Sequence, residues 1–306
     1  MTVLDTIGQT TLLPLRYMVP ARSARIFVKL EYENPTGSMK DRMALAMVRA
    51  AEADGRLRPG GSVVEYTGGS TGVSLAFVCA ARRIPLEIVT SDAFSREKRA
   101  HMAALGARLT LIPSPTGGTT KALTLEMIEA ARRLASAPGC YWTDQLNNRD
   151  QLSAYERMGD EILEQTGGRI SAFVQSVGTA GSLRGISTRL RAHDGGVRIV
   201  AVEPEESAVL SGGPSGSHQI EGTGPGFVMP LWDPALAEEI QTVSSREAME
   251  TARRLAREEG IFAGTSTGGN VAVALRVAER LGTGHTVVTV AVDSGMKYLS
   301  TAQYGG

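Results

Sequence analysis

The feature that most constrains the fold of this chain is a regular alternation of short strand-like runs and longer amphipathic segments. Residues 62–66, 86–90 and 108–112 are short apolar runs, and apolar residues in the segments between them recur at helical spacing. Strands that alternate with helices are typical of parallel sheets with crossover helices. The sequence therefore predicts an α/β fold of parallel-type sheets flanked by helices.

The same pattern gives expected bounds for the elements. Strands are expected at 26–30, 62–66, 86–90, 108–112, 172–175, 199–202, 261–262 and 286–292. Helices are expected from residue 40 onward, at 71–83, 95–105, 123–134 and 151–165, up to residue 193, and at 244–260. A long Gly/Pro-rich loop at 203–230 interrupts the alternation, and loops of that length in compact domains are usually functional or mobile.

Composition limits the classes of partner. Lys and Arg number 32, Asp and Glu also number 32, and no stretch concentrates one sign, so nothing points to nucleic acid or to an anionic membrane. No run reaches the ~18 apolar residues of a membrane span, and the N-terminus lacks the regions of a secretion signal. With only Cys79 and Cys140, a disulfide framework is not expected. We expect a small-molecule partner and a cytoplasmic location.

The segment 34–42, Asn-Pro-Thr-Gly-Ser-Met-Lys-Asp-Arg, joins the strand at 26–30 to an amphipathic helix. Its Pro and Gly break the strand, Ser38 can cap the helix, and Lys40 then falls in the first helical turn. A cation is disfavoured there by the helix dipole, by about 0.3–1 kcal/mol when exposed. Lys40 is therefore a candidate for chemistry, and a solvated lysine is the alternative.

Three glycine-rich turns, at 67–72, 178–182 and 264–269, each follow an expected strand and open a helix. Glycine lets the backbone approach a ligand closely, and a helix N-terminus offers unpaired N–H groups and the positive end of the dipole. Each turn could hold a phosphate or a carboxylate. Because parallel sheets place such turns on one edge, three of them together favour a ligand site over simple chain reversal.

Other chemistries lack their motifs. No dinucleotide-binding or nucleoside-triphosphate fingerprint occurs, and the four histidines have no closely spaced partner that would suggest a metal site. The nucleophile elbow Gly-x-Ser-x-Gly matches around Ser70 and around Ser266. His285 precedes Asp293, the reverse of the acid-then-histidine order of that hydrolase fold, whereas Ser70 could still recruit His218. A serine hydrolase is therefore a minor alternative.

The segments 34–42, 67–72, 178–182 and 264–268, in this order and spacing, resemble the pyridoxal-phosphate enzymes of the cysteine synthase and cystathionine β-synthase family, of fold type II. The likeness extends to the opening segment 7–15 and the closing segment 293–301, so it covers nearly the whole chain. It implies two α/β lobes with the cofactor in the cleft between them, as in tryptophan synthase β. We expect a smaller lobe at 36–148, a larger lobe formed by 1–35 and 149–306, and a homodimer.

The resemblance also implies roles for individual residues. Lys40 would form the imine with pyridoxal 5'-phosphate and move the substrate's α-proton. Thr267 would face the pyridine nitrogen as a neutral hydroxyl, and Gly222 would lie near the substrate's amino group. The cofactor phosphate would be bound by Gly178, Thr179, Ala180, Gly181 and Ser182, with Gly181 needing close backbone approach. The substrate carboxylate would be bound by Thr67, Gly68, Gly69, Thr71 and Gln145.

One turn departs from the family. The family usually reads Thr-Ser-Gly-Asn-Thr-Gly there, with the asparagine contacting the cofactor's 3-oxygen, whereas this chain has Gly68 and Ser70. A serine hydroxyl can donate one hydrogen bond where the amide donates two. We expect Ser70 to contact the cofactor; a helix cap or a hydrolase nucleophile are the alternatives.

The resemblance implies a β-replacement enzyme, a transferase or lyase of amino-acid biosynthesis. An O-activated serine such as O-acetylserine would lose its leaving group to give an aminoacrylate, and sulfide or a thiol would add to give cysteine or a related amino acid. A serine or threonine dehydratase is the alternative within the cofactor class. A non-catalytic homologue that binds a partner protein is the alternative from another class.

Overall fold

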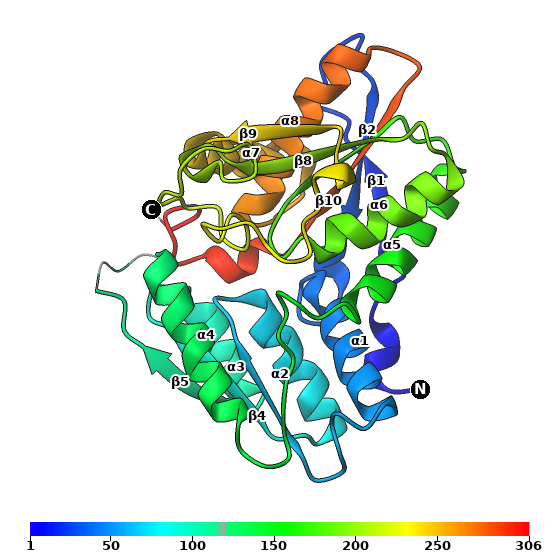
Figure 1. The fold of residues 1–306 in the computed structure, drawn as a ribbon. Coiled ribbons are helices and arrows are strands. Elements are labelled where there is room, and N and C mark those ends of the chain that lie inside the picture. Colours follow the sequence, from blue (N-terminus) through cyan, green and yellow to red (C-terminus); the bar gives the residue numbers. More distant parts are fainter. Residues whose placement is uncertain (116, 118–119, 306) are drawn as a thin grey trace.

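The computed structural model describes residues 1–115, 117 and 120–305, and it contains two sheets with helices packed around each (Figure 1). The six-stranded sheet has the order β1 (Leu12–Pro14), β2 (Arg25–Leu30), β10 (Thr286–Ala291), β7 (Ala172–Ser176), β8 (Arg198–Pro204), β9 (Glu239–Val243). The four-stranded sheet has the order β5 (Arg108–Ile112), β4 (Leu86–Ser91), β3 (Ser62–Tyr66), β6 (Cys140–Trp142). All pairs are parallel except β1 with β2, so the predicted α/β class is confirmed.

Eight α-helices among the described residues connect these strands. They are α1 (Lys40–Ala53), α2 (Ser70–Arg82), α3 (Arg96–Ala104), α4 (Lys121–Ala135), α5 (Gln151–Thr166), α6 (Gly181–His193), α7 (Ser245–Arg254) and α8 (Thr265–Leu281). A π-helical turn at Leu255–Glu259 continues α7 as far as Gly260, where φ is +72°. In Figure 1, α1 to α4 accompany the smaller sheet in the lower part, and α6 to α8 accompany the larger sheet in the upper part.

The sequence missed three strands and placed one where none forms. β1 and β6 have three residues each, which is too short for a periodic pattern, and the half-buried β9 lies at a sheet edge. Residues 261–262 form no strand; only Ala263 makes an isolated bridge, to Ser294. The third glycine-rich turn therefore does not follow a strand. The lobe boundaries near residues 36 and 148 stay a prediction.

Four charged side chains, Lys29, Glu31, Arg42 and Glu161, form a buried charge cluster where β2, α1 and α5 meet. Arg42 binds Glu31 (Nε to Oε2, 2.7 Å) and Glu161 (Nη1 to Oε1, 2.6 Å). Lys29 Nζ lies 2.7 Å from Glu161 Oε2. The four formal charges sum to zero, which is how a buried cluster of this kind avoids an uncompensated charge. The cluster anchors α1 two residues after Lys40.

We expect Glu161→Gln to lower the free energy of unfolding by about 3–5 kcal/mol, because it leaves one positive charge uncompensated in a buried site. Urea unfolding at pH 7 measures this change. Asp160→Asn on the same helix is the matched control: Asp160 pairs with Arg189 on the surface, and such pairs contribute about 0–1 kcal/mol. Equal losses for the two variants would contradict a special role for the cluster.

The buried charge cluster also predicts how the stability of the protein changes with acid. Burial alone would raise the pKa of Glu161, but hydrogen bonds and charge from Arg42 and Lys29 lower it to about 2, from an ordinary value of 4.5. A carboxylate with a lowered folded-state pKa adds stability above its unfolded pKa and loses it as the pH falls toward the folded value. The stability difference between wild type and Glu161→Gln should therefore shrink as the pH falls from 4.5 to 2.

Candidate active site

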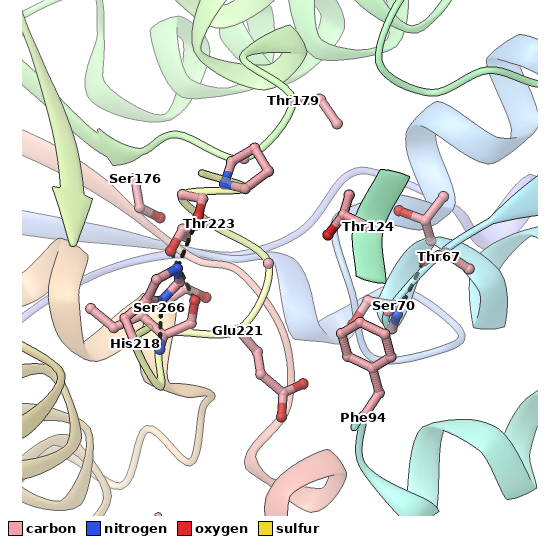
Figure 2. A pocket seen from close by; sticks show the side chains of 18 of the residues that line it. Thr67, Ser70, Phe94, Thr124, Ser176, Thr179, His218, Glu221, Thr223 and Ser266 are labelled. Carbon is pink, nitrogen blue, oxygen red and sulfur yellow. Dashed lines mark hydrogen bonds between the residues drawn. The ribbon is translucent and has the colours of Figure 1, made fainter. Parts of the chain in front are cut away.

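A cavity of about 410 Å³ lies between the segments that follow the strands of the two sheets. Figure 2 shows side chains from both sides of it, with Thr67, Ser70 and Phe94 facing Thr179, Thr223 and Ser266. The long loop predicted at 203–230 supplies part of the wall, through residues 215–218 and 220–226. Of the predicted site residues, the cavity brings together Lys40, Thr67, Gly68, Gly69, Ser70, Thr71, Gln145, Gly178, Thr179, Ser182 and Gly222.

Lys40 is the first residue of α1 and lies half-buried on the cavity wall. Its backbone N–H donates to Ser38 Oγ at 3.2 Å, so Ser38 does serve the helix start, although Met39 occupies the cap position. Burial lowers the pKa of Lys40 to about 8, and the negative charge of Asp293 opposes that shift. The amine can therefore exist in both its charged and its neutral form near pH 8.

The turn at 67–72 is shaped by close packing and by a neighbouring amide. A Cβ on Gly68 would overlap the ring of Phe94, so a larger residue at this position would require Phe94 to move. Gly69 N–H donates to Thr67 Oγ1 at 3.1 Å, and Thr71 Oγ1 donates to Gln145 Oε1 at 2.8 Å. The start of α2 thus faces the cavity with Gln145 beside it, which suits an anion.

The turn at 178–182 presents the start of α6 to the other side of the cavity. A Cβ on Gly178 would overlap the carbonyl oxygen of Gly222, and Ala180 has a φ of +67°, in the left-handed region. Ala180 and Gly181 lie behind the lining residues. We expected Gly181 to be glycine so that the cofactor phosphate can approach its backbone closely; the structure shows instead that the space a Cβ would need is filled by Gln151.

The residue predicted to face the pyridine nitrogen, Thr267, does not line the cavity. Thr267 is fully buried, and its Oγ1 accepts a hydrogen bond from Val292 N–H at 3.0 Å. The preceding residue, Ser266, lines the cavity instead. Successive residues at the start of α8 point in different directions, and spacing alone did not show which hydroxyl faces inward.

The hydrogen bonds of Ser70 match neither a helix cap nor a side chain with a free proton for the cofactor. Gly69, not Ser70, occupies the cap position of α2, so the helix-cap alternative is wrong. Ser70 Oγ donates to Asp293 Oδ2 at 2.8 Å and lies 3.4 Å from Lys297 Nζ. A hydroxyl has one proton, so the bond to Asp293 leaves none for a second acceptor in this arrangement.

The hydrolase alternative lacks its base. His218 Nδ1 accepts from Ile220 N–H at 3.2 Å, which leaves Nε2 to carry the proton toward the carbonyl oxygen of Gly224 at 2.9 Å. Both ring nitrogens are therefore engaged, and neither is positioned to take the proton of Ser70.

Sequence reasoning missed several charged residues of the site. Lys98 lines the cavity, binds Glu221 (Nζ to Oε2, 2.5 Å) and lies 3.1 Å from Tyr298 OH. Tyr298 OH in turn donates to Asp293 Oδ2 at 2.9 Å. Asp293 and Tyr298 belong to the closing segment 293–301, and the resemblance of that segment was the only available signal.

Within residues 1–115, 117 and 120–305, His, Cys, Asp and Glu side chains form no group of three or more that could hold a metal ion. In the same part of the chain, no helix has the length and apolar character required to cross a membrane.

Together the fold and the site define a class: an α/β protein whose two sheets place a half-buried lysine between two glycine-rich turns suited to anions. The chain belongs to the pyridoxal-phosphate-dependent enzymes. The family model described as "Pyridoxal-phosphate dependent enzyme" matches residues 3–293.

Relatives and solved structures resemble the chain over nearly its whole length. A cysteine synthase of Staphylococcus aureus is 40% identical over 304 residues, covering 99% of this chain and 96% of the relative. An O-ureido-L-serine synthase of Streptomyces lavendulae is 39% identical over 307 residues, covering 100% and 93%. The structure of an O-acetylserine-dependent cystathionine β-synthase from Helicobacter pylori has a TM-score of 0.92 at 32% identity, covering 99% and 98%.

The different positions of Ser266 and Thr267 at the start of α8 give a test. We expect Ser266→Ala to shift the cofactor's visible absorbance and leave stability nearly unchanged, because Ser266 lines the cavity. Thr267→Val should instead leave the spectrum unchanged and cost about 1–3 kcal/mol of stability, since it removes the acceptor of the buried Val292 N–H. Absorbance spectra and urea unfolding measure the two effects. The opposite pattern would restore Thr267 to the role.

Proposed function

We propose that the protein catalyses a pyridoxal-phosphate-dependent β-replacement on an O-activated serine such as O-acetylserine, with sulfide or a thiol as nucleophile. The observation that carries the proposal is the position of Lys40, on the cavity wall between the turns at 67–72 and 178–182. The printed names of the relatives, cysteine synthase, O-ureido-L-serine synthase and O-acetylserine-dependent cystathionine β-synthase, support the same substrate class.

When bound, the cofactor supplies an electron sink for the bonds at the substrate's α-carbon. We assign the phosphate to the turn at 178–182, where the start of α6 supplies N–H groups and a positive dipole end. The substrate carboxylate is assigned to Thr67, Gly68, Gly69, Thr71 and Gln145 on the facing wall. Gly222, beside Gly178, is assigned to the neighbourhood of the substrate's amino group.

Lys40 carries two proposed roles, covalent attachment of the cofactor and movement of the α-proton. A general base works best when its pKa lies near the working pH, and burial lowers the pKa of Lys40 to about 8. We propose that Ser266 takes the role predicted for Thr267, facing the pyridine nitrogen with a neutral hydroxyl. Such a hydroxyl, unlike a carboxylate, does not hold that nitrogen protonated, which favours loss of the β-substituent.

The alternative reaction is a serine or threonine dehydratase, in which water takes the place of the added nucleophile and the product is a keto acid. A panel of serine derivatives crossed with sulfide and several thiols, read by mass spectrometry, separates the two. We expect a new amino acid with the nucleophile attached. A keto acid from every derivative, with no adduct from any thiol, would favour the dehydratase.

We further propose that the protein acts in the cytoplasm as a homodimer. Free thiols are the state expected in a reducing compartment, and Cys79 and Cys140 are both free, which supports the cytoplasm. Leu13 and Tyr17 expose large apolar side chains near the sheet-edge strand β1, which supports a dimer contact there. Light scattering of the holoprotein measures the mass directly, and a mass of 32.4 kDa, that of one chain, would contradict the dimer.

Replacing Lys40 tests the proposed attachment of the cofactor. We expect Lys40→Ala to lose the yellow absorbance of the bound cofactor and all turnover, because it removes the half-buried lysine at the start of α1 on the cavity wall. Lys121→Ala is the matched control, since Lys121 also begins a helix and lines the same cavity but is exposed. A fully active Lys40→Ala protein would rule the proposal out.

The Ser70 position tests how this turn reaches the cofactor. We expect Ser70→Ala to change the cofactor's absorbance and to lower kcat/KM by about one to two powers of ten, because it removes the hydrogen bond to the carboxylate of Asp293, whose charge acts on Lys40. Ser70→Asn, which supplies two donors, should retain activity. If both variants match the wild type in spectrum and rate, Ser70 has no part in cofactor binding.

A further inference from the structure

Gln151, the first residue of α5, is a fully buried amide that the predicted site did not include. Its Nε2 donates to the carbonyl oxygens of Gln145 at 2.8 Å and Asn148 at 2.7 Å. Its Oε1 accepts from Thr179 Oγ1 at 3.3 Å. Both amide protons are used, and a flipped amide would place its oxygen against two carbonyl oxygens, so the orientation is fixed.

On one side, hydrogen bonds connect Gln151 through Gln145 to the turn at 67–72, which is assigned to the substrate carboxylate. Gln145 N–H donates to Glu65 Oε2 at 3.0 Å, and Gln145 Nε2 donates to the carbonyl oxygen of Tyr66 at 2.9 Å. Gln145 Oε1 then accepts from Thr71 at 2.8 Å. Gln145 is therefore held at its backbone carbonyl by Gln151, at its N–H by Glu65, and at its side chain by the turn itself.

On the other side, Gln151 packs into the turn assigned to the cofactor phosphate. Thr179, which donates to Gln151, also accepts from Gly181 N–H at 3.3 Å. The space that a Cβ on Gly181 would need is filled by the Gln151 side chain. Glycine at position 181 thus serves the approach of Gln151, and a displacement of this amide would disturb the turn at two points.

We propose that Gln151 is a positioning residue that fixes the two ligand-facing turns relative to each other. One turn follows a strand of the four-stranded sheet and the other follows a strand of the six-stranded sheet, and Gln151 bonds to Thr179 of one and to Gln145 beside the other. The inference rests on the proposed function for the assignment of the turns. Loss of the amide is expected to weaken cofactor and substrate binding together, although Gln151 touches neither.

The test uses Gln151→Leu, which keeps the size and removes all three hydrogen bonds. Cofactor affinity is measured by adding pyridoxal 5'-phosphate to apoprotein and following fluorescence. Substrate binding is measured from the absorbance change on adding L-alanine, an amino acid without a β leaving group. We expect the dissociation constant of the cofactor and the half-saturating L-alanine concentration each to rise about tenfold, the effect of leaving buried hydrogen-bond groups unpaired.

Gln165→Leu on the same helix is the matched control. Gln165 also donates to a carbonyl oxygen, that of Thr10, and accepts from Lys29. Neither of these partners belongs to the turn at 67–72 or to the turn at 178–182. It should lower the apoprotein's stability while leaving both binding constants within about twofold of wild type. If Gln151→Leu does not fold, Gln151→Glu, which keeps the acceptor for Thr179 and loses both donors, is judged by the same criteria.

The proposal is overturned if the Gln151 variant changes only one of the two binding constants, changes neither, or is matched in both by Gln165→Leu. None of these measurements requires turnover. They stay informative even if product analysis of the wild type gives a different reaction, so failure of the coupling and failure of the proposed function are distinguishable.

Discussion

Arg42 binds carboxylates from two distant parts of the chain, and this buried contact holds the first turn of α1 in place. Glu31 comes from the segment after β2 and Glu161 from α5, so the guanidinium joins three elements around one centre. A guanidinium suits this position because its planar fork offers several donors at fixed angles. Lys40 lies two residues earlier on the same helix. The cluster therefore holds in place the helical turn that carries Lys40.

The parallel sheets explain why the ligand-facing turns meet. β3 leads into the turn at 67–72 and β7 into the turn at 178–182, so each turn lies at the carboxyl end of its own sheet. Open α/β sheets bind ligands at that edge. Because the two edges face one cavity, two helix starts converge on it with the positive ends of their dipoles. A small molecule with two anionic groups fits this arrangement better than a polymer does.

Ser70, which stands where the family usually has asparagine, is held by hydrogen bonds among charged and polar side chains. Ser70 gives its single proton to Asp293, which also accepts from Tyr298, and Tyr298 lies beside Lys98. Burial lowers the pKa of Lys297 to about 8, and Asp293 opposes that shift as it does for Lys40. The charge of Asp293 thus acts on both lysines, the half-buried Lys40 and the buried Lys297, and its carboxylate orients the hydroxyl of Ser70.

The sequence by itself determined the α/β class, most element bounds, the position of Lys40 at a helix start and two of the three glycine-rich turns after strands. These features are local: periodicity, capping and strand breakage are read within a few residues. Only the tertiary structure decided that Ser266 rather than Thr267 faces the cavity and that Gly181 makes room for Gln151. It also showed that Ser70 is committed to Asp293. Those outcomes depend on side-chain direction and on partners from about 30 to more than 200 residues away, which no local pattern encodes.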